Sequence, residues 1–317
     1  MLAPGSRLYG PLVSARELDE QRDLFVAALG MEVRGETVLD RRGAEALLGP
    51  GAGETTLLAL QTPGVPAGAV VCRHAAPSDE TVRDPGAPLD RDAFKVVDFH
   101  APDLAAAAEG AAAAGFAVST PDGEYDMAGI GLREAHVRGA DALTVALLGG
   151  APGALDPYVR VTDRAVSEVL GITAPVTDVD AAERFYADVL GWKVVHEYAV
   201  DGASVASLVG AGTRVRMEGR CIGTAADEPY VGLVTYTVEH GRTAGTSLRG
   251  RAVAPRRGLV GAVVVTDDLD GVRARAGAAA GEPVAMALAP FGVTRAAVVR
   301  PPYEVPHLVV EAGEMPA

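Results

Sequence analysis

The sequence predicts an α+β fold made of four βαβββ modules. Residues 24–33 and 185–194 are similar at a constant offset of 161 residues, so the two halves of the chain are related. In each quarter of the chain an acidic residue is followed 12 or 13 residues later by a glycine, and β-rich runs follow that glycine. This repeated spacing predicts one helix and three further strands in every module.

The acids and the glycines correspond to the two ends of each helix. A carboxylate just before a helix accepts hydrogen bonds from the free N–H groups of the first turn, and glycine supplies the left-handed residue that ends many helices. The four acids are Glu17, Asp103, Asp178 and Asp268, and the four glycines are Gly30, Gly115, Gly191 and Gly281. We expect a helix of about three turns between each pair.

The domain organisation follows from the module order if neighbouring modules pair. Residues 1–150 would then form a first domain, with modules at about 7–75 and 92–150. Residues 165–317 would form a second domain, with modules at about 167–240 and 258–313, after a linker at 151–164. The β-rich run at 203–217 is assigned to a strand of the third module.

Composition excludes several classes of protein. Hydrophobic residues make up 49% of the chain and charged residues 22%, which is incompatible with a disordered chain. The net charge of −14 disfavours nucleic acids and anionic membranes as partners. Two distant cysteines and an N-terminus without a signal-peptide pattern favour a cytoplasmic protein without disulfides.

The third module carries a recognisable motif. Residues 176–191 read Val-Thr-Asp-Val-Asp-Ala-Ala-Glu-Arg-Phe-Tyr-Ala-Asp-Val-Leu-Gly. This segment closely resembles the signature of the vicinal oxygen chelate superfamily, which includes glyoxalase I, bleomycin-resistance proteins and extradiol dioxygenases. The resemblance implies paired modules whose sheets curl into cups, with small molecules held on the concave face.

The same resemblance implies where a metal would be bound. Members that use a metal place a ligand in the first strand, seven residues before the capping acid, and another in the last strand. The first-strand positions here are Gly10, Val96, Gly171 and Gly261, and His307 and Thr144 occupy last-strand positions. Because none of the four first-strand residues has a ligating side chain, we expect no metal and no other cofactor, and we reject dioxygenase chemistry.

The first strand of the second module carries the best candidate for chemistry. Its alternation places Asp98 and His100 on the cup face, roughly 6.5 to 7 Å apart at their Cα atoms. His100 is therefore predicted to be a general acid or base, and Asp98 to orient it. Residues predicted to contact the substrate are His307, Thr144, Thr173 and Tyr303.

Three functions are compatible with these residues. The first is a metal-independent enzyme of isomerase, cyclase or lyase type that moves a proton on a carbonyl-rich metabolite, possibly one of secondary metabolism. The second is a non-catalytic protein that binds an antibiotic or metabolite, as bleomycin-resistance proteins do. The third is a glyoxalase-type metalloenzyme with shifted ligands such as Asp98, His100 and His307. In each case we expect a small-molecule ligand and a monomer or homodimer.

Overall fold

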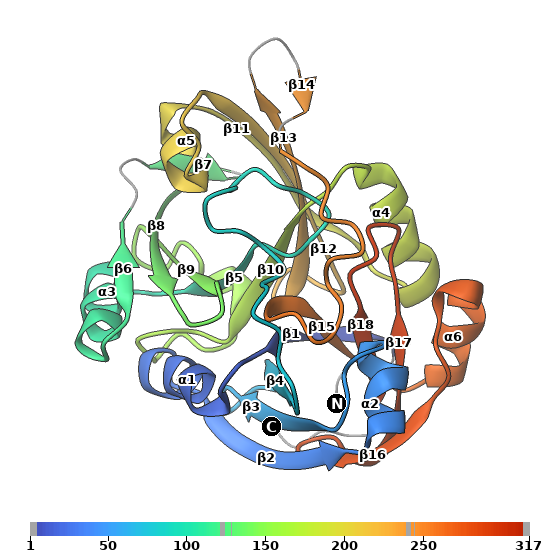
Figure 1. Cartoon of the computed structure of the whole chain (residues 1–317). Coiled ribbons are helices and arrows are strands. Elements are labelled where there is room, and N and C mark those ends of the chain that lie inside the picture. Colours follow the sequence, from blue (N-terminus) through green and yellow to red (C-terminus); the bar gives the residue numbers. More distant parts are fainter. Residues whose placement is uncertain (1–4, 121–123, 128, 239–241, 244, 313–317) are drawn as a thin grey trace.

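The computed structural model describes residues 5–120, 124–127, 129–238, 242–243 and 245–312. Two curved sheets lie side by side, and helices cover their outer faces (Figure 1). The eight-stranded sheet has the order β16-β17-β18-β15-β1-β4-β3-β2, and the ten-stranded sheet contains the path β11-β12-β13-β10-β5-β9-β8-β6. The predicted α+β class is confirmed. No helix among the described residues is long and apolar enough to span a membrane.

The first and fourth modules build the eight-stranded sheet. The first comprises β1 (Arg7–Ser14), α1 (Leu18–Asp23), the π-helical turn η1 (Leu24–Ala28), β2 (Glu32–Leu39), α2 (Arg41–Leu48), β3 (Thr55–Gln61) and β4 (Gly68–His74). The fourth comprises β15 (Gly258–Thr266), α6 (Leu269–Ala276), the 3-10 turn η5 (Gly277–Ala279), β16 (Val284–Leu288), β17 (Gly292–Val299) and β18 (His307–Glu311).

The second and third modules build the ten-stranded sheet. The second comprises β5 (Val96–His100), α3 (Leu104–Ala113), β6 (Ala117–Ser119), β7 (Tyr125–Met127), β8 (Ile130–Arg138) and β9 (Thr144–Gly150). After the 3-10 turn η2 (Asp156–Tyr158), the third comprises β10 (Val169–Pro175), α4 (Val179–Phe185), the π-helical turn η3 (Tyr186–Leu190), β11 (Lys193–Gly202), α5 (Ala203–Val209), β12 (Val215–Gly223), β13 (Tyr230–Val238) and β14 (Arg242–Thr243).

The expected pairing of consecutive modules is wrong. Strand β1 pairs antiparallel with β15, so the first module shares its sheet with the fourth, and β5 pairs antiparallel with β10, so the second shares its sheet with the third. The two modules within residues 1–150 therefore lie in different sheets, and so do the two modules within residues 165–317. The repeat spacing fixes the capped helix of each module, but the partner of a module depends on contacts between first strands that the spacing does not describe.

The predicted helix ends are largely confirmed. Asp103, Asp178 and Asp268 each accept a hydrogen bond from a backbone N–H of the first turn, whereas Glu17 makes no such bond. Three of the four glycines, Gly30, Gly115 and Gly191, have positive φ. In the fourth module the helix ends earlier, because Gly277 takes the positive φ and Gly281 does not.

Helix α5 corrects the assignment of residues 203–217 to a strand. Residues Ala203–Val209 form a short helix, and only Val215–Gly223 form strand β12. The buried side chains Val205 and Val209 lie four positions apart, which is one helical turn. Gly202 and Gly210, both with positive φ, bound the helix on either side. This helix matters because it covers part of the cavity described below.

The two sheets share one continuous core that includes aromatic side chains. Tyr186 of η3 stacks on Trp192 with ring centroids 5.4 Å apart and an interplanar angle of 7°. The Trp192 indole N–H donates to the carbonyl oxygen of Ser6, 2.6 Å away, and so joins the third module to the first. These aromatic residues belong to the core, as their helical spacing favours.

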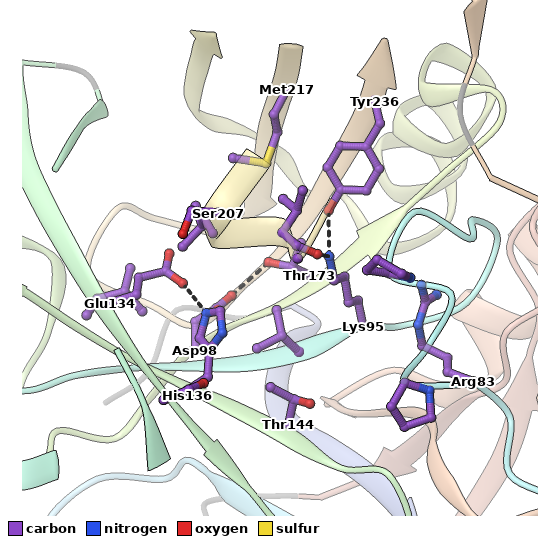
Figure 2. A pocket seen from close by; sticks show the side chains of 18 of the residues that line it. Arg83, Lys95, Asp98, Glu134, His136, Thr144, Thr173, Ser207, Met217 and Tyr236 are labelled. Atoms are coloured by element: carbon purple, nitrogen blue, oxygen red, sulfur yellow. Dashed lines mark hydrogen bonds and ion pairs between the residues drawn. The ribbon is translucent and has the colours of Figure 1, made fainter. Parts of the chain in front are cut away.

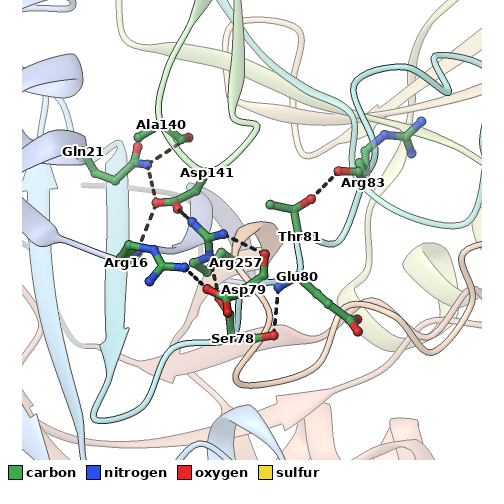
Figure 3. Close-up of polar contacts among 10 residues, drawn as sticks. All are labelled: Arg16, Gln21, Ser78, Asp79, Glu80, Thr81, Arg83, Ala140, Asp141 and Arg257. Carbon is green, nitrogen blue, oxygen red and sulfur yellow. Dashed lines mark hydrogen bonds and ion pairs between the residues drawn. The ribbon is translucent and has the colours of Figure 1, made fainter.

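A buried carboxylate connects the second module to the eight-stranded sheet (Figure 3). Asp141, in the β8–β9 turn, accepts hydrogen bonds from the Arg16 backbone N–H and from the Gln21 amide, at 3.1 and 3.2 Å. The guanidinium of Arg257, just before β15, donates to the second carboxylate oxygen at 2.5 Å. Arg257 also donates to the carbonyl oxygens of Ser78 and Asp79 in the 76–91 linker, which connects β4 to β5. One charged pair thus holds three segments together.

Candidate functional site

The ten-stranded sheet carries a cavity of about 330 Å³. Both of its modules line it, and helix α5 and the linker segment 83–88 complete the wall (Figure 2). Four tyrosines are among the lining residues: Tyr125, Tyr198, Tyr230 and Tyr236. The size and the aromatic walls suit a small planar organic molecule.

Strand register places the polar residues of the cavity floor in one row. Asp98 of β5 and His136 of β8 both lie opposite Ala146 of the intervening strand β9. On its other side Asp98 lies opposite Gly171 of β10. Two strand spacings separate Asp98 from His136, which is about 10 Å between Cα atoms. The small side chain of Ala146 thus leaves space above the sheet between these two polar side chains.

The surroundings of Asp98 favour the protonated form of its carboxyl group. Burial raises the pKa of its carboxyl well above the ordinary value, and the negative charge of Glu134 raises it further. The Thr173 hydroxyl donates to Oδ2 at 2.7 Å and opposes part of this shift. A protonated Asp98 can donate a hydrogen bond to a carbonyl oxygen of a ligand.

Glu134 and His136 form a second polar unit on β8. The Nε2 atom of His136 lies 2.8 Å from Oε2 of Glu134, and the Tyr125 hydroxyl donates to Oε1 of the same carboxylate. With Nε2–H donated to Glu134, Nδ1 of His136 is left as an acceptor. An imidazole oriented by a carboxylate is the usual arrangement of a general base. Burial, followed by the charge of Glu134, raises the pKa of the Tyr125 phenol, so Tyr125 remains a donor.

The structure brings three of the six predicted site residues into this cavity. Asp98, Thr144 and Thr173 all line it. The predicted pair of Asp98 with His100 does not form, since Asp98 bonds to Thr173 instead. His100 is not among the lining residues and its Nδ1 lies 3.1 Å from the Leu148 carbonyl oxygen. The alternation along β5 correctly places Asp98 on the cavity face of the sheet, but the imidazole of His100 contacts the backbone of the neighbouring strand β9.

His307 and Tyr303 also lie outside the cavity. Nε2 of His307 bonds to the Tyr186 hydroxyl at 2.7 Å, Nδ1 lies 3.0 Å from the Val305 carbonyl oxygen, and the Tyr303 hydroxyl bonds to Tyr186. Burial lowers the pKa of His307 to about 4. His307 and Tyr303 are predicted to contact the substrate, but in the structure they belong to a buried hydrogen-bond chain that joins β18 to η3.

Glu134, His136 and Lys95 also line the cavity, although they are not among the residues predicted from the sequence. The signal for the first two is an alternation within β8, where Glu134, His136 and Arg138 occupy every second position and point to one face. Lys95 directly precedes β5, and its Nζ donates to the Val209 carbonyl oxygen of α5 at 3.2 Å. The feature of the sequence that could have drawn attention to Lys95 is the scarcity of lysine, because the chain has only two lysines among its 28 Lys and Arg residues.

The first-strand positions that the family uses for a metal do not fit one here. A Cβ added at Gly171 would lie 2.6 Å from Cε2 of the Tyr230 ring, which covers the position. At Gly261 and Gly10 an added Cβ would lie 2.3 and 1.7 Å from the carbonyl oxygens of Pro306 and Gly68. Among the described residues no group of three or more His, Cys, Asp or Glu side chains could hold a metal ion. The shifted ligand set also fails, because Asp98 and His307 belong to different sheets.

These features define a class of protein: paired βαβββ modules that form a small-molecule cavity on the inner face of a shared sheet. Residues 169–296 match the family model of the Glyoxalase/Bleomycin resistance protein/Dioxygenase superfamily. The matched segment contains residues 176–191, so their resemblance to the vicinal oxygen chelate signature is confirmed. The match supports a small-molecule enzyme or a small-molecule-binding protein.

Solved structures of low sequence identity have the same fold. Glyoxalase I from Zea mays is 11% identical, with a TM-score of 0.59 over 96% of this chain and 92% of that chain. A putative dioxygenase from Bacillus subtilis is also 11% identical, with a TM-score of 0.60 over 99% of this chain and 87% of that one. A search of curated proteins finds no match. At these identities the similarity shows the fold alone.

Replacing Asp98 with asparagine should stabilise the protein at neutral pH. Because the folded-state pKa of Asp98 is raised, its contribution to stability is fully present only below the unfolded pKa of about 3.9 and is lost as pH rises through the folded pKa. Asparagine has no charge to desolvate and can still accept from Thr173. Urea unfolding of both proteins should therefore show a gain for Asp98→Asn at pH 7 that shrinks towards pH 4. A less stable variant at pH 7 would contradict the protonated state of Asp98.

Proposed function

We propose that the chain is a metal-independent enzyme that moves a proton on a carbonyl compound bound in the ten-stranded sheet. The observation that carries the proposal is the pairing of unlike groups across one cavity: His136 oriented by Glu134, and Asp98 with a raised pKa. A carboxyl group whose protonated form is favoured by burial, placed across a cavity from a carboxylate-oriented imidazole, is typical of acid–base sites. We further propose that it acts in the cytoplasm as a monomer or homodimer.

In this proposal His136 is the base and Asp98 the hydrogen-bond donor. Nδ1 of His136 takes a proton from the carbon next to the carbonyl, and Glu134 stabilises the imidazolium that forms. The carboxyl of Asp98 donates to the carbonyl oxygen as it gains negative charge, and Thr173 fixes the carboxyl orientation. Return of the proton to a different atom gives an isomerase, and loss of a leaving group gives a lyase.

The second candidate is a binding protein without turnover. It is favoured by the four tyrosines of the cavity wall, whose rings can stack on a planar antibiotic or metabolite. On this alternative, Asp98 and His136 would only hydrogen-bond to the ligand. The two functions differ in whether a bound carbonyl compound exchanges protons with solvent.

The test is deuterium exchange from D₂O into 6-carboxy-2-tetralone, a ketone fused to a benzene ring that carries a carboxylate. Proton NMR should show that the protein accelerates the loss of signal from the hydrogens on the carbons next to the ketone. Its neutral parent, 2-tetralone, provides the comparison for the carboxylate. If the protein binds the ketoacid without exchange above the uncatalysed rate, the binding-protein alternative is supported.

A second prediction concerns metal content. Because Gly171, Gly261 and Gly10 are covered at the family's ligand positions, elemental analysis of the purified protein should find substoichiometric Zn, Fe, Ni and Mn. Exchange activity should survive dialysis against EDTA. One tightly held equivalent of metal, lost together with activity on chelation, would contradict metal independence.

A further inference from the structure

Three cationic side chains line the cavity. They are Lys95, from just before β5, Arg83 of the linker, and Arg138, the last residue of β8. Figure 2 shows Lys95 and Arg83 on the opposite side of the cavity from Glu134. In a chain with 42 acidic residues and a net charge of −14, a cavity lined by three cations is suited to an anion.

The protein itself supplies no anionic partner for them among its described residues. Lys95 donates to two neutral oxygens, the Val209 carbonyl at 3.2 Å and the Tyr236 hydroxyl at 3.4 Å. Arg83 donates to the carbonyl oxygens of Asp90 and Ala93, and Arg138 donates to the Thr144 hydroxyl at 2.6 Å. No described carboxylate lies within 4.0 Å of the charged nitrogens of these three side chains. Asp84 also lines the cavity, but its carboxylate accepts from the backbone N–H of Gly86.

The surroundings of Lys95 disfavour its charged form. Burial lowers the pKa of Lys95 to about 7, and the positive charges of Arg83 and Arg138 contribute to the shift. Glu134 acts in the opposite direction but does not compensate. An anion placed between these side chains would offset both the burial and the repulsion.

We propose that Lys95, Arg83 and Arg138 form a subsite for a carboxylate of the ligand. This inference deepens the proposed function, because it assigns the substrate to the carbonyl acids. Carboxylates are matched by ammonium and guanidinium donors, and Arg138 can present two parallel N–H groups.

Strand geometry sets the spacing between the carboxylate and the reacting carbonyl. Arg138 follows His136 by two residues on β8, and Lys95 precedes Asp98 by three residues. Two residues along a strand span roughly 6.5 to 7 Å. A ligand that places its carboxylate against Arg138 therefore has its carbonyl carbon about that distance away, beside His136, whereas about 10 Å of strand separates Lys95 from Asp98. In 6-carboxy-2-tetralone the ketone and the carboxylate are separated by a similar length.

The test uses two molecules of nearly equal shape, 2-naphthoate and 2-naphthamide, neither of which can react. A molecule of about 13 non-hydrogen atoms should bind with a dissociation constant of roughly 1 mM or better in a suitable cavity. Calorimetry at pH 6 should give at least about tenfold tighter binding of naphthoate, as expected for charge-assisted hydrogen bonds. Lys95→Met and Arg138→Gln should each remove most of that preference, whereas Lys193→Met, on exposed β11, should not. Equal affinity for the two molecules, or no naphthoate binding at all, would overturn the proposal.

The scarcity of lysine allows a second, independent readout. With ¹⁵N-labelled lysine side chains the protein has only two signals, and Lys95→Met assigns them. Naphthoate should raise the pKa of Lys95 from about 7, while naphthamide leaves it unchanged. Naphthoate affinity should accordingly fall as pH rises above about 7. A naphthoate preference without deuterium exchange of the ketoacid would retain the subsite and reject the catalytic proposal. Deuterium exchange of the ketoacid without a preference for naphthoate would retain the catalytic proposal and reject the subsite.

Discussion

Replacing His136 with glutamine should slow deuterium exchange into 6-carboxy-2-tetralone by roughly 10²- to 10⁴-fold, the usual contribution of a general base. The glutamine amide can still donate to Glu134, as Nε2 of His136 does at 2.8 Å, but it cannot accept a proton at neutral pH. The loss should appear in the rate constant at saturating ketoacid, with little change in 2-naphthoate affinity. Proton NMR and calorimetry on the same preparation measure both quantities.

His100→Gln is the matched control. His100 is on the same side of the sheet, but its Nδ1 lies 3.1 Å from the Leu148 carbonyl oxygen and it is not among the cavity-lining residues. Glutamine can donate to the same carbonyl, so exchange should continue at the parental rate. If His100→Gln abolishes exchange while His136→Gln does not, the assignment of the base to β8 is wrong.

Replacing Asp141 with asparagine should cost about 3 to 5 kcal/mol of folding free energy, because it leaves a buried cation without its partner. The side chains of Asp141 and Arg257 are only 1% and 14% exposed. Asp141 has a φ of 57°, a left-handed conformation that asparagine also tolerates, so the substitution changes the charge and not the backbone. Urea unfolding should show a lower midpoint with an unchanged slope.

Asp79 provides the exposed counterpart in the same cluster. It forms an ion pair with Arg16, but its side chain is 95% exposed, so solvent and salt screen the interaction. Asp79→Asn should leave the unfolding midpoint unchanged within error. Equal effects of Asp79→Asn and Asp141→Asn would contradict the view that the buried pair joins the second module to the eight-stranded sheet.

The sequence predicts the inside of each module well because local physics fixes it. The caps Asp103, Asp178 and Asp268 and the left-handed glycines act within a few residues of where they stand. The alternation along β5 likewise identifies the face of Asp98, and the same reasoning applied to β8 would have identified Glu134 and His136.

The remaining features depend on contacts between distant segments. The joining of first and fourth modules depends on the antiparallel register of β1 with β15, in which Leu12 lies opposite Gly261. The place of His307 is set by the Tyr186 hydroxyl, 121 positions away in the sequence. The covering of Gly171 by the Tyr230 ring is likewise a contact across strands. Spacing within one module contains no information about these partners.

The most direct measurement is a crystal structure of the His136→Gln protein with 6-carboxy-2-tetralone bound. We predict the ligand in the cavity of the ten-stranded sheet, with its carboxylate within hydrogen-bond distance of Arg138 and Lys95. Its ketone oxygen should accept from Asp98, and a carbon next to the ketone should face residue 136. A ligand bound to the eight-stranded sheet, or one whose carboxylate lies against Glu134, would contradict both the site and its proposed chemistry.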